Sequence, residues 1–191
     1  MTENTGTQQP LLQVSDLAVQ YGSGKNAFVA VSDITLEIAP GETLGLVGES
    51  GSGKSTIGKA ILGLEKVHAG SVRFLGQDIT HDSLKKRKKT AADLRVVFQD
   101  PYTSLNPSME VGQILAEPLE IQGMEGAAAK KRIAELLDQV GLPTDALQRM
   151  PREFSGGQRQ RVAIARALAL QPKLIVCDEP VSALEIGRAH V

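Results

Sequence analysis

The chain has 191 residues, with 21 basic and 22 acidic side chains and a formal net charge of −1. This length fits one domain, with room for an inserted subdomain, and the balanced charge gives no electrostatic footprint for nucleic acid. The single cysteine, Cys177, excludes an internal disulfide. No run of about eighteen apolar residues occurs, so the sequence predicts no membrane-spanning helix.

The first segments predict a disordered lead followed by strands. Residues 1–10 are polar and lack the apolar region of a secretory signal, which fits a cytoplasmic protein. Apolar residues alternate over 12–21, with a change of phase at Ser15 and Asp16, and a glycine-rich turn follows at 22–24. A second alternating stretch at 34–38 predicts a half-exposed strand, and Pro40 and Gly41 predict a turn after it.

Residues 43–56 carry the first motif with chemical meaning. The apolar run at 43–47 predicts a buried strand, and residues 48–55, GESGSGKS, fit the pattern G-x-x-x-x-G-K-[ST]. Ile57, Ala60, Ile61 and Leu64 then follow helical spacing. Strand, glycine loop and helix are the context that distinguishes a phosphate-binding loop from a glycine-rich turn that binds nothing.

The chemistry of this loop follows from its residue types. Gly48, Gly51 and Gly53 allow backbone angles that let N–H groups converge on phosphate oxygens. The helix N-terminus behind them adds partial positive charge. Lys54 would reach the β- and γ-phosphates, and the Ser55 hydroxyl would ligate magnesium.

Two further strands frame a basic run. Residues 71–75 predict a short strand, and residues 94–98 predict an apolar strand that ends before Pro101. Between them, residues 85–89 are five consecutive basic side chains. The simpler interpretation is a solvated surface turn or helix start, and the alternative is contact with anionic lipid headgroups.

From about residue 107 to 163 the pattern is helical. One short helix is predicted around Val111, and Ile133, Leu136, Leu137 and Val140 form a stripe that ends at Gly141. Ser155 and Gln158 have capping-box spacing and open a helix predicted to run to about residue 171. Residues 174–177 predict a fully apolar strand, which is followed by two carboxylates, Asp178 and Glu179.

Residues 154–161, FSGGQRQR, resemble the signature motif of ATP-binding cassette (ABC) ATPases. Two glycines in the first turn of a helix cost about 1 kcal/mol each against alanine, which is useful only where something approaches the backbone closely. The resemblance covers residues 11–184. It implies an α/β P-loop NTPase core with an N-terminal antiparallel β subdomain and an α-helical subdomain inserted at about 107–163.

The resemblance also implies roles for individual residues. Asp178 would hold magnesium, Glu179 would orient or deprotonate the attacking water, and Gln99 would sense the γ-phosphate and help to hold the metal. Tyr21 matches the aromatic residue that stacks on adenine. The residues implied to act on ATP and Mg²⁺ are catalytic Glu179, Lys54 and Gln99; nucleotide-binding Tyr21, Gly48, Glu49, Ser50, Gly51, Ser52, Gly53, Lys54, Ser55, Thr56, Ser155, Gly156, Gly157 and Gln158; and metal-binding Ser55, Gln99 and Asp178.

A finer likeness is to the peptide and nickel importer subfamily. Residues 97–107, 154–161 and 177–184 carry it. It implies an ATPase on the cytoplasmic face of the membrane that energises uptake of dipeptides or oligopeptides, with nickel or glutathione as alternative substrates. Implied partners are transmembrane permease subunits, a second identical or similar ATPase and, indirectly, an extracytoplasmic solute-binding protein, but no nucleic acid.

The family resemblance implies a dimer in which each ATP lies between the phosphate loop of one chain and Ser155 of the other. The competing class is a soluble ABC ATPase that acts in DNA repair or on the ribosome. ABC ATPases of DNA repair carry long coiled-coil insertions, and those of the ribosome carry two cassettes. A P-loop kinase or GTPase would not explain residues 155–161.

The family pattern fails after Leu184. Glu185 stands where the family has aspartate, and the switch histidine is not found. Residues 185–191 can be back-translated into a sequence that resembles a common sequencing adapter, so we expect a non-native tail on a C-terminally truncated fragment. Such a fragment is expected to hydrolyse ATP poorly and to aggregate.

Overall fold

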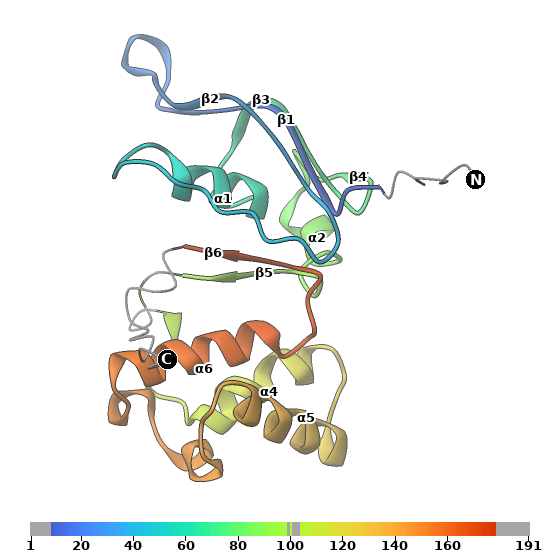
Figure 1. Cartoon of the computed structure of the whole chain (residues 1–191), viewed down its shortest axis with the longest axis vertical. Coiled ribbons are helices and arrows are strands. Elements are labelled where there is room, and N and C mark those ends of the chain that lie inside the picture. The colour runs from blue at the N-terminus through green and yellow to red at the C-terminus, as the bar shows by residue number, and fades with distance from the viewer. Residues whose placement is uncertain (1–8, 99, 101–103, 179–191) are drawn as a thin grey trace, which may run out of the picture. The chain divides into compact units, whose positions relative to one another are not determined.

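The computed structural model describes residues 9–98, 100 and 104–178, which form two compact units divided between Ala91 and Ala92 (Figure 1). The predicted disordered lead falls largely outside the described residues, as do Gln99, Glu179 and the tail.

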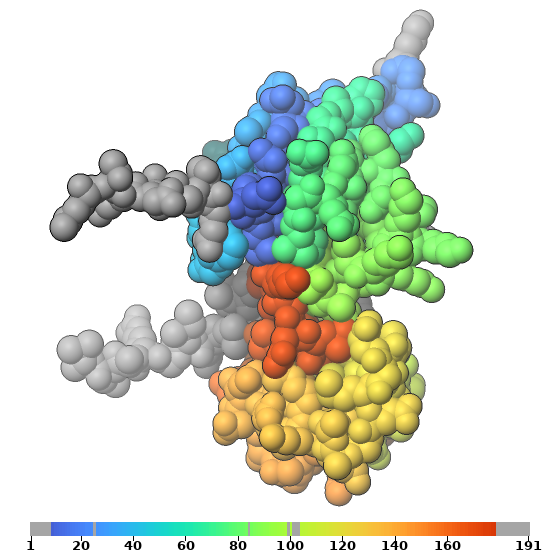
Figure 2. Space-filling model, turned by 90° about the vertical axis from the view of Figure 1, so that its right-hand side faces the viewer, coloured from blue at the N-terminus to red at the C-terminus, as the bar shows by residue number. Residues whose placement is uncertain are grey.

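The first unit is built on a four-stranded antiparallel sheet in the order β2-β1-β3-β4. Its strands are β1 (Leu12–Tyr21), β2 (Phe28–Ile38), β3 (Val67–Phe74) and β4 (Gln77–Asp78), with a 3₁₀ turn at Gly24–Asn26 between the first two. β1 and β3, far apart in sequence, lie side by side (Figure 2). This is the N-terminal antiparallel sheet that the resemblance implied.

β1 confirms the predicted change of phase. Leu12 and Val14 are buried, and so are Leu17 and Val19, because an irregularity at Asp16 lets both pairs face the core. Asp16 has φ 49°, and its N–H donates to Thr35 Oγ1 at 3.0 Å. A left-handed residue fixed in this way is typical of a β-bulge, which adds one residue without breaking the strand.

Helix α1 (Lys54–Leu62) packs against the sheet through most of the predicted stripe. Ile57, Ala60 and Ile61 are buried. The prediction is wrong for the last member, Leu64, which lies beyond the end of the helix. The helix stops at Gly63, which has φ 72°, and Leu64 is 57 % exposed. A left-handed glycine after the last helical residue ends the helical spacing at that point.

The predicted buried strand at residues 43–47 is wrong for this structure. The segment is extended but belongs to no sheet, and Val47 is 99 % exposed. A strand needs a neighbour for its backbone N–H and C=O groups and a layer against which its side chains pack. Within the described part of the chain, no strand pairs with residues 43–47, so the apolar pattern has no ladder to join.

The basic run at residues 85–89 was expected to be a solvated surface segment, and this expectation is wrong for Arg87. Helix α2 (Leu84–Arg87) begins it, and Lys85, Lys86, Lys88 and Lys89 are exposed. Arg87, however, is buried and donates to the carbonyl oxygens of Ile61 at 2.8 Å and Ile79 at 2.6 Å. Burial lowers its pKa, yet its planar fork reaches two carbonyls that a lysine could not serve together.

The second unit combines a parallel strand pair with a helical core. β5 (Leu94–Val97) pairs in parallel with β6 (Leu174–Cys177), so the strand predicted to reach residue 98 ends one residue earlier. The helices are α4 (Val111–Ile121), α5 (Gly126–Gln139) and α6 (Gly156–Leu168), with 3₁₀ turns at Thr144–Gln148 and Pro151–Glu153.

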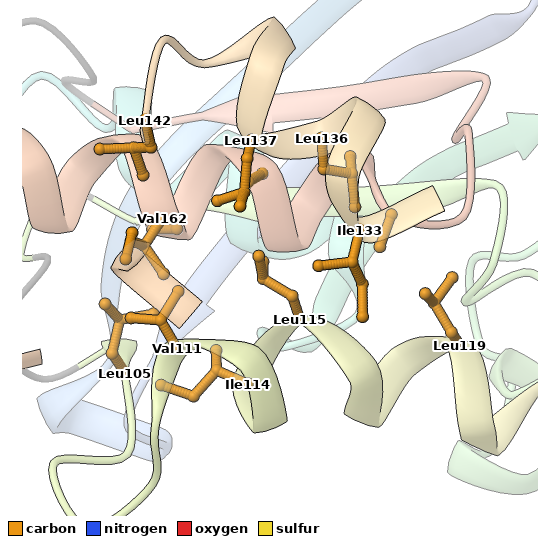
Figure 3. Packing of buried hydrophobic residues seen from close by; sticks show 14 of the residues in the cluster. Leu105, Val111, Ile114, Leu115, Leu119, Ile133, Leu136, Leu137, Leu142 and Val162 are labelled. Atoms are coloured by element: carbon orange, nitrogen blue, oxygen red, sulfur yellow. The ribbon is translucent and has the colours of Figure 1, made fainter. Parts of the chain in front are cut away.

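The helical core is built mainly from apolar side chains. Figure 3 shows Leu115 of α4 directed toward Ile133 and Leu137 of α5, and Val162 of α6 belongs to the same cluster. The predicted stripe on α5 is confirmed, and Gly141 (φ 63°) follows that helix as expected. Helix α6 ends at Leu168 rather than near residue 171, and the chain turns at Gln171 (φ 52°) before Pro172.

None of the described helices is both long enough and apolar enough to span a bilayer.

Candidate nucleotide-binding site

The glycine loop has the backbone that the motif predicts. Gly51 has φ 80° and Gly53 has φ 91°, a region that costs other residues about 1–2 kcal/mol. Gly53 is the N-cap of α1, so the loop leads directly into the N-terminus of that helix. The first N–H groups of a helix have no carbonyl partner within it, so this end is suited to an anion.

Lys54 lies over the loop. Its Nζ donates to the carbonyl oxygens of Gly48 at 2.8 Å and Glu49 at 2.7 Å, and it approaches Ser52 Oγ at 3.4 Å. The ammonium group is therefore held against the backbone of the loop, although Lys54 is the first residue of the helix. These contacts place one positive charge against the loop that precedes the N-terminus of α1.

A close packing contact joins the loop to strand β2. A Cβ added to Gly53 would overlap Val31 Cγ1 and would lie 3.0 Å from the carbonyl oxygen of Ala30. Val31 is buried opposite Val19 of β1. The phosphate loop is therefore anchored to the β1–β2 hairpin near the turn that joins the two strands.

Tyr21, the predicted adenine contact, lies at that end of the hairpin. It is the last residue of β1, and its side chain is 37 % exposed. Since it follows Val19 by two residues in the strand, it lies on the same face of the sheet as Val19 and Val31. The first unit thus brings Tyr21 and the glycine loop together on one face.

The signature residues lie in the second unit, at the N-terminus of α6. Ser155 is the N-cap: its Oγ accepts from the Gln158 N–H at 3.3 Å, and Gln158 Oε1 accepts from the Ser155 N–H at 3.0 Å. The predicted capping box is confirmed. Ser155 itself is exposed, so its hydroxyl and the glycine backbone behind it are accessible to a ligand.

Arginines fix the segment that carries the signature. Arg159 Nε donates to the carbonyl oxygen of Phe154 at 3.1 Å, and the Arg149 guanidinium lies over the buried Phe154 ring, 4.2 Å from its centroid. Arg161 reaches the carbonyl oxygens of Val140 and Gly141 after α5. The sequence motif therefore serves two purposes, since its glycines leave the helix end open while its arginines hold the preceding turn.

The acidic pair is described only in part. Asp178 directly follows β6, and its N–H donates to the carbonyl oxygen of Val97 at 3.0 Å, which continues the parallel pairing. Glu179 and Gln99 lie outside the described residues. The hydroxyl of Ser55 in the first unit and the carboxylate of Asp178 in the second unit are each hard oxygen donors, the class that Mg²⁺ prefers.

Sequence reasoning missed two residues that shape the first unit. Arg87 was grouped with the exposed lysines. An arginine is a better candidate than a lysine for burial, because its planar guanidinium can donate to two acceptors at once. Phe28 received no role because the strand was predicted to begin only at residue 34. Aromatic residues on both sides of the turn at 22–24 could have indicated a role for Phe28. The sequence does not show, however, which residues of the two strands lie opposite each other.

The comparisons with known proteins agree with this geometry. The profile of the family described as ABC transporter matches residues 31–182. The chain belongs to the ABC transporter family of ATP-binding cassette proteins.

Two curated relatives carry peptide-transport names. The oligopeptide transport ATP-binding protein OppF of Lactococcus lactis is 47 % identical over 185 residues, which cover 93 % of this chain and 58 % of that protein. OppF of Haemophilus influenzae is 43 % identical over 194 residues, covering 96 % of this chain and 58 % of the relative. The chain therefore spans somewhat more than half the length of these relatives.

A solved structure has the same fold. The ATP-binding cassette MJ0796, in a dimeric post-hydrolysis state bound to ADP and Pi, superposes with a TM-score of 0.83 at 32 % identity. The match covers 92 % of this chain and 76 % of that one. The fold is thus an α/β ABC ATPase cassette, as the signature motif implied.

Proposed function

We propose that the protein carrying this chain is the ATP-binding and ATP-hydrolysing subunit of an ABC importer that takes up dipeptides or oligopeptides. The observation that carries the proposal is the glycine loop, with Lys54 held over it, at the N-terminus of α1. The second exposed helix N-terminus, capped by Ser155, supports a cassette rather than a P-loop kinase or GTPase.

ATP binds first to the loop and the hairpin. Adenine stacks on Tyr21, and the phosphates take the N–H groups of residues 48–56. Lys54 exchanges the neutral carbonyl oxygens of Gly48 and Glu49 for phosphate oxygens. A hydrogen bond between two charged groups is about twice as strong as one to a neutral acceptor, so this exchange favours the bound state.

Ser55, Asp178 and Gln99 would hold Mg²⁺, with Asp178 acting through water. The metal would supply positive charge that neutralises the negative charge developing during phosphoryl transfer. Glu179 orients the attacking water and accepts its proton.

The complete site requires a second chain. Ser155 and the N–H groups of Gly156 and Gly157 approach the γ-phosphate of an ATP bound to the partner's loop. A transferring phosphoryl group needs stabilisation on several sides, so one chain alone is a poor catalyst. The dimeric, ADP- and Pi-bound state named for MJ0796 supports this arrangement. ATP favours the closed dimer, and hydrolysis releases it.

In the importer, this cycle drives transmembrane permease subunits from the cytoplasmic face of the membrane, and a solute-binding protein delivers the substrate outside. The names of the curated relatives support a peptide substrate. Nickel and glutathione are the alternative cargoes, and a soluble ABC ATPase is the alternative class.

Two variants of the full-length protein test the enzyme. Lys54→Ala is expected to lose tight ATP binding, because the phosphates lose their main cationic contact. Glu179→Gln is expected to bind ATP with normal affinity but to hydrolyse it at least about a hundredfold more slowly, as for loss of a general base. Equilibrium titration and phosphate release measure the two properties. Wild-type turnover in Glu179→Gln would contradict the assigned base.

A separate experiment tests the transport role. The full-length protein is co-expressed with the permease subunits of its own locus, and the purified complex is reconstituted into vesicles with the cognate solute-binding protein. ATP-dependent uptake of labelled di- or oligopeptide is expected, with Lys54→Ala as the inactive control. Uptake of nickel or glutathione in place of peptide would select an alternative cargo, and failure to co-purify with any permease would favour the soluble class.

A further inference from the structure

The turn end of the β1–β2 hairpin carries two aromatic side chains. Tyr21 is directly opposite Phe28 in the antiparallel register, and the Phe28 side chain is 66 % exposed. Side chains directly opposite each other in an antiparallel pair stand on the same face, about 4.5–5.5 Å apart at Cβ. Tyr21 and Phe28 therefore form one aromatic surface.

A register shift decides which face that surface occupies. Val19 pairs with Val31, but the next residue, Gln20, pairs with Val29, so Ala30 is an extra residue on β2. Val31 is the third residue after Phe28, and strict alternation would place the two on opposite faces. The bulge at Ala30 restores Phe28 to the face of Val19 and Val31.

The phosphate loop covers this same face. Gly53 packs against Val31 and the Ala30 carbonyl, and Ile57 of α1 is buried in the same unit. In Figure 1, the hairpin tip and the N-terminus of α1 lie at the same end of the first unit. A nucleotide whose phosphates occupy the loop can therefore place its base against the face that carries Tyr21 and Phe28.

We infer that Phe28 is a second aromatic contact for adenine, beside Tyr21; this inference rests on the proposed ATP-binding function. Base–aromatic stacking uses the π face of the ring and needs no hydrogen bond, so either ring can take an adenine. Aromatic neighbours also fix each other in edge-to-face or offset geometry. Phe28 thus contributes affinity for the base and holds Tyr21 in position, while leaving the phosphate contacts unchanged.

The test separates the base from the phosphates. The full-length protein is titrated calorimetrically with a non-hydrolysable imido analogue of ATP and, separately, with inorganic triphosphate, both with Mg²⁺. Phe28→Ala is expected to weaken the ATP analogue about five- to thirtyfold, as for loss of one stacking contact, and to leave triphosphate binding within about twofold. The matched control is Val29→Ala, which is 54 % exposed, lies opposite Gln20 on the other face and is expected to change neither affinity.

Phe28→Leu keeps an apolar side chain of similar size but removes the π face. It is expected to weaken the ATP analogue selectively, and it decides the question if Phe28→Ala does not fold. Unchanged ATP-analogue binding in Phe28→Leu, or an equal loss for both ligands, would overturn the role of Phe28. If the wild-type protein binds neither ligand, the proposed function itself fails, which is a different result.

Discussion

Gly53 and Val31 are in van der Waals contact across the phosphate loop and strand β2, so close that any Cβ at residue 53 would overlap Val31 Cγ1. Gly53 also has φ 91° and caps α1. The contact couples the position of the nucleotide loop to the β1–β2 hairpin, since Val31 is in turn buried opposite Val19. A motif glycine therefore has a packing role in addition to its role toward phosphate.

Gly53→Ala should accordingly destabilise the full-length protein by about 2–4 kcal/mol, from a left-handed alanine and an overlap with Val31 together. Two glycines provide graded controls. Gly51 has φ 80°, but no atom lies within 4 Å of a Cβ added there, so Gly51→Ala should lower the unfolding free energy by only about 1–2 kcal/mol. Gly45→Ala has neither constraint and should stay within about 0.5 kcal/mol. Urea unfolding measures all three, and equal losses in Gly53→Ala and Gly51→Ala would show that Val31 yields without cost.

Ser155→Arg should prevent dimer formation while sparing nucleotide binding by its own chain, because the larger side chain occupies the open end of α6. Ser155→Ala is the matched control: it removes the same cap to Gln158, at a cost of about 1 kcal/mol, without adding bulk. Both are made in the Glu179→Gln background and examined by size exclusion with light scattering in saturating ATP. Ser155→Ala should retain a weaker dimer, and a stable dimer of Ser155→Arg would argue against action between chains.

Arg87→Ala should cost about 3 kcal/mol of unfolding free energy, since it removes two charged hydrogen bonds and leaves the carbonyls of Ile61 and Ile79 without that donor. The neighbouring Lys88→Ala, which is exposed, should change stability by less than about 0.5 kcal/mol. Chemical denaturation of both variants checks the difference. Similar small effects would mean that solvent replaces the Arg87 contacts.

Asp78 gives a prediction about pH. The Thr80 hydroxyl donates to its carboxylate at 2.6 Å and the Thr80 N–H at 2.9 Å, and these two bonds lower the pKa of Asp78 below its ordinary value of 3.8. A lowered folded-state pKa contributes stability that is present above the unfolded pKa and is lost as pH falls through the folded pKa. Asp78→Asn should therefore destabilise the protein at pH 7 but progressively less below pH 4.

The expected effect of Asp78→Asn is no more than about 1 kcal/mol, because the carboxylate is exposed and screened by solvent. Thr80→Val is the companion variant. It should cost more at every pH, because the buried Thr80 hydroxyl also accepts from the Val72 N–H at 2.8 Å. Thermal unfolding across the pH range measures both variants, and a pH-independent loss in Asp78→Asn would refute the linkage.

The sequence by itself determined the features that depend on a few neighbouring residues. Glycine spacing defines the loop at 48–55, the stripe through Ile133 and Leu137 defines α5, and Ser155 with Gln158 defines the start of α6. Each of these signals acts within one or two turns of chain, where propensity, capping and periodicity operate directly. The family resemblance added site residues that no spacing could supply.

Only the tertiary structure decided the features that depend on distant partners. Residues 43–47 have a strand pattern without a pairing strand among the described residues, and Arg87 is buried because α1 and the turn after β4 present carbonyls to it. The bulge at Ala30 sets the face of Phe28 through hydrogen bonds to β1. Backbone pairing and burial are satisfied between segments far apart in sequence, so local pattern cannot specify register, partner or exposure.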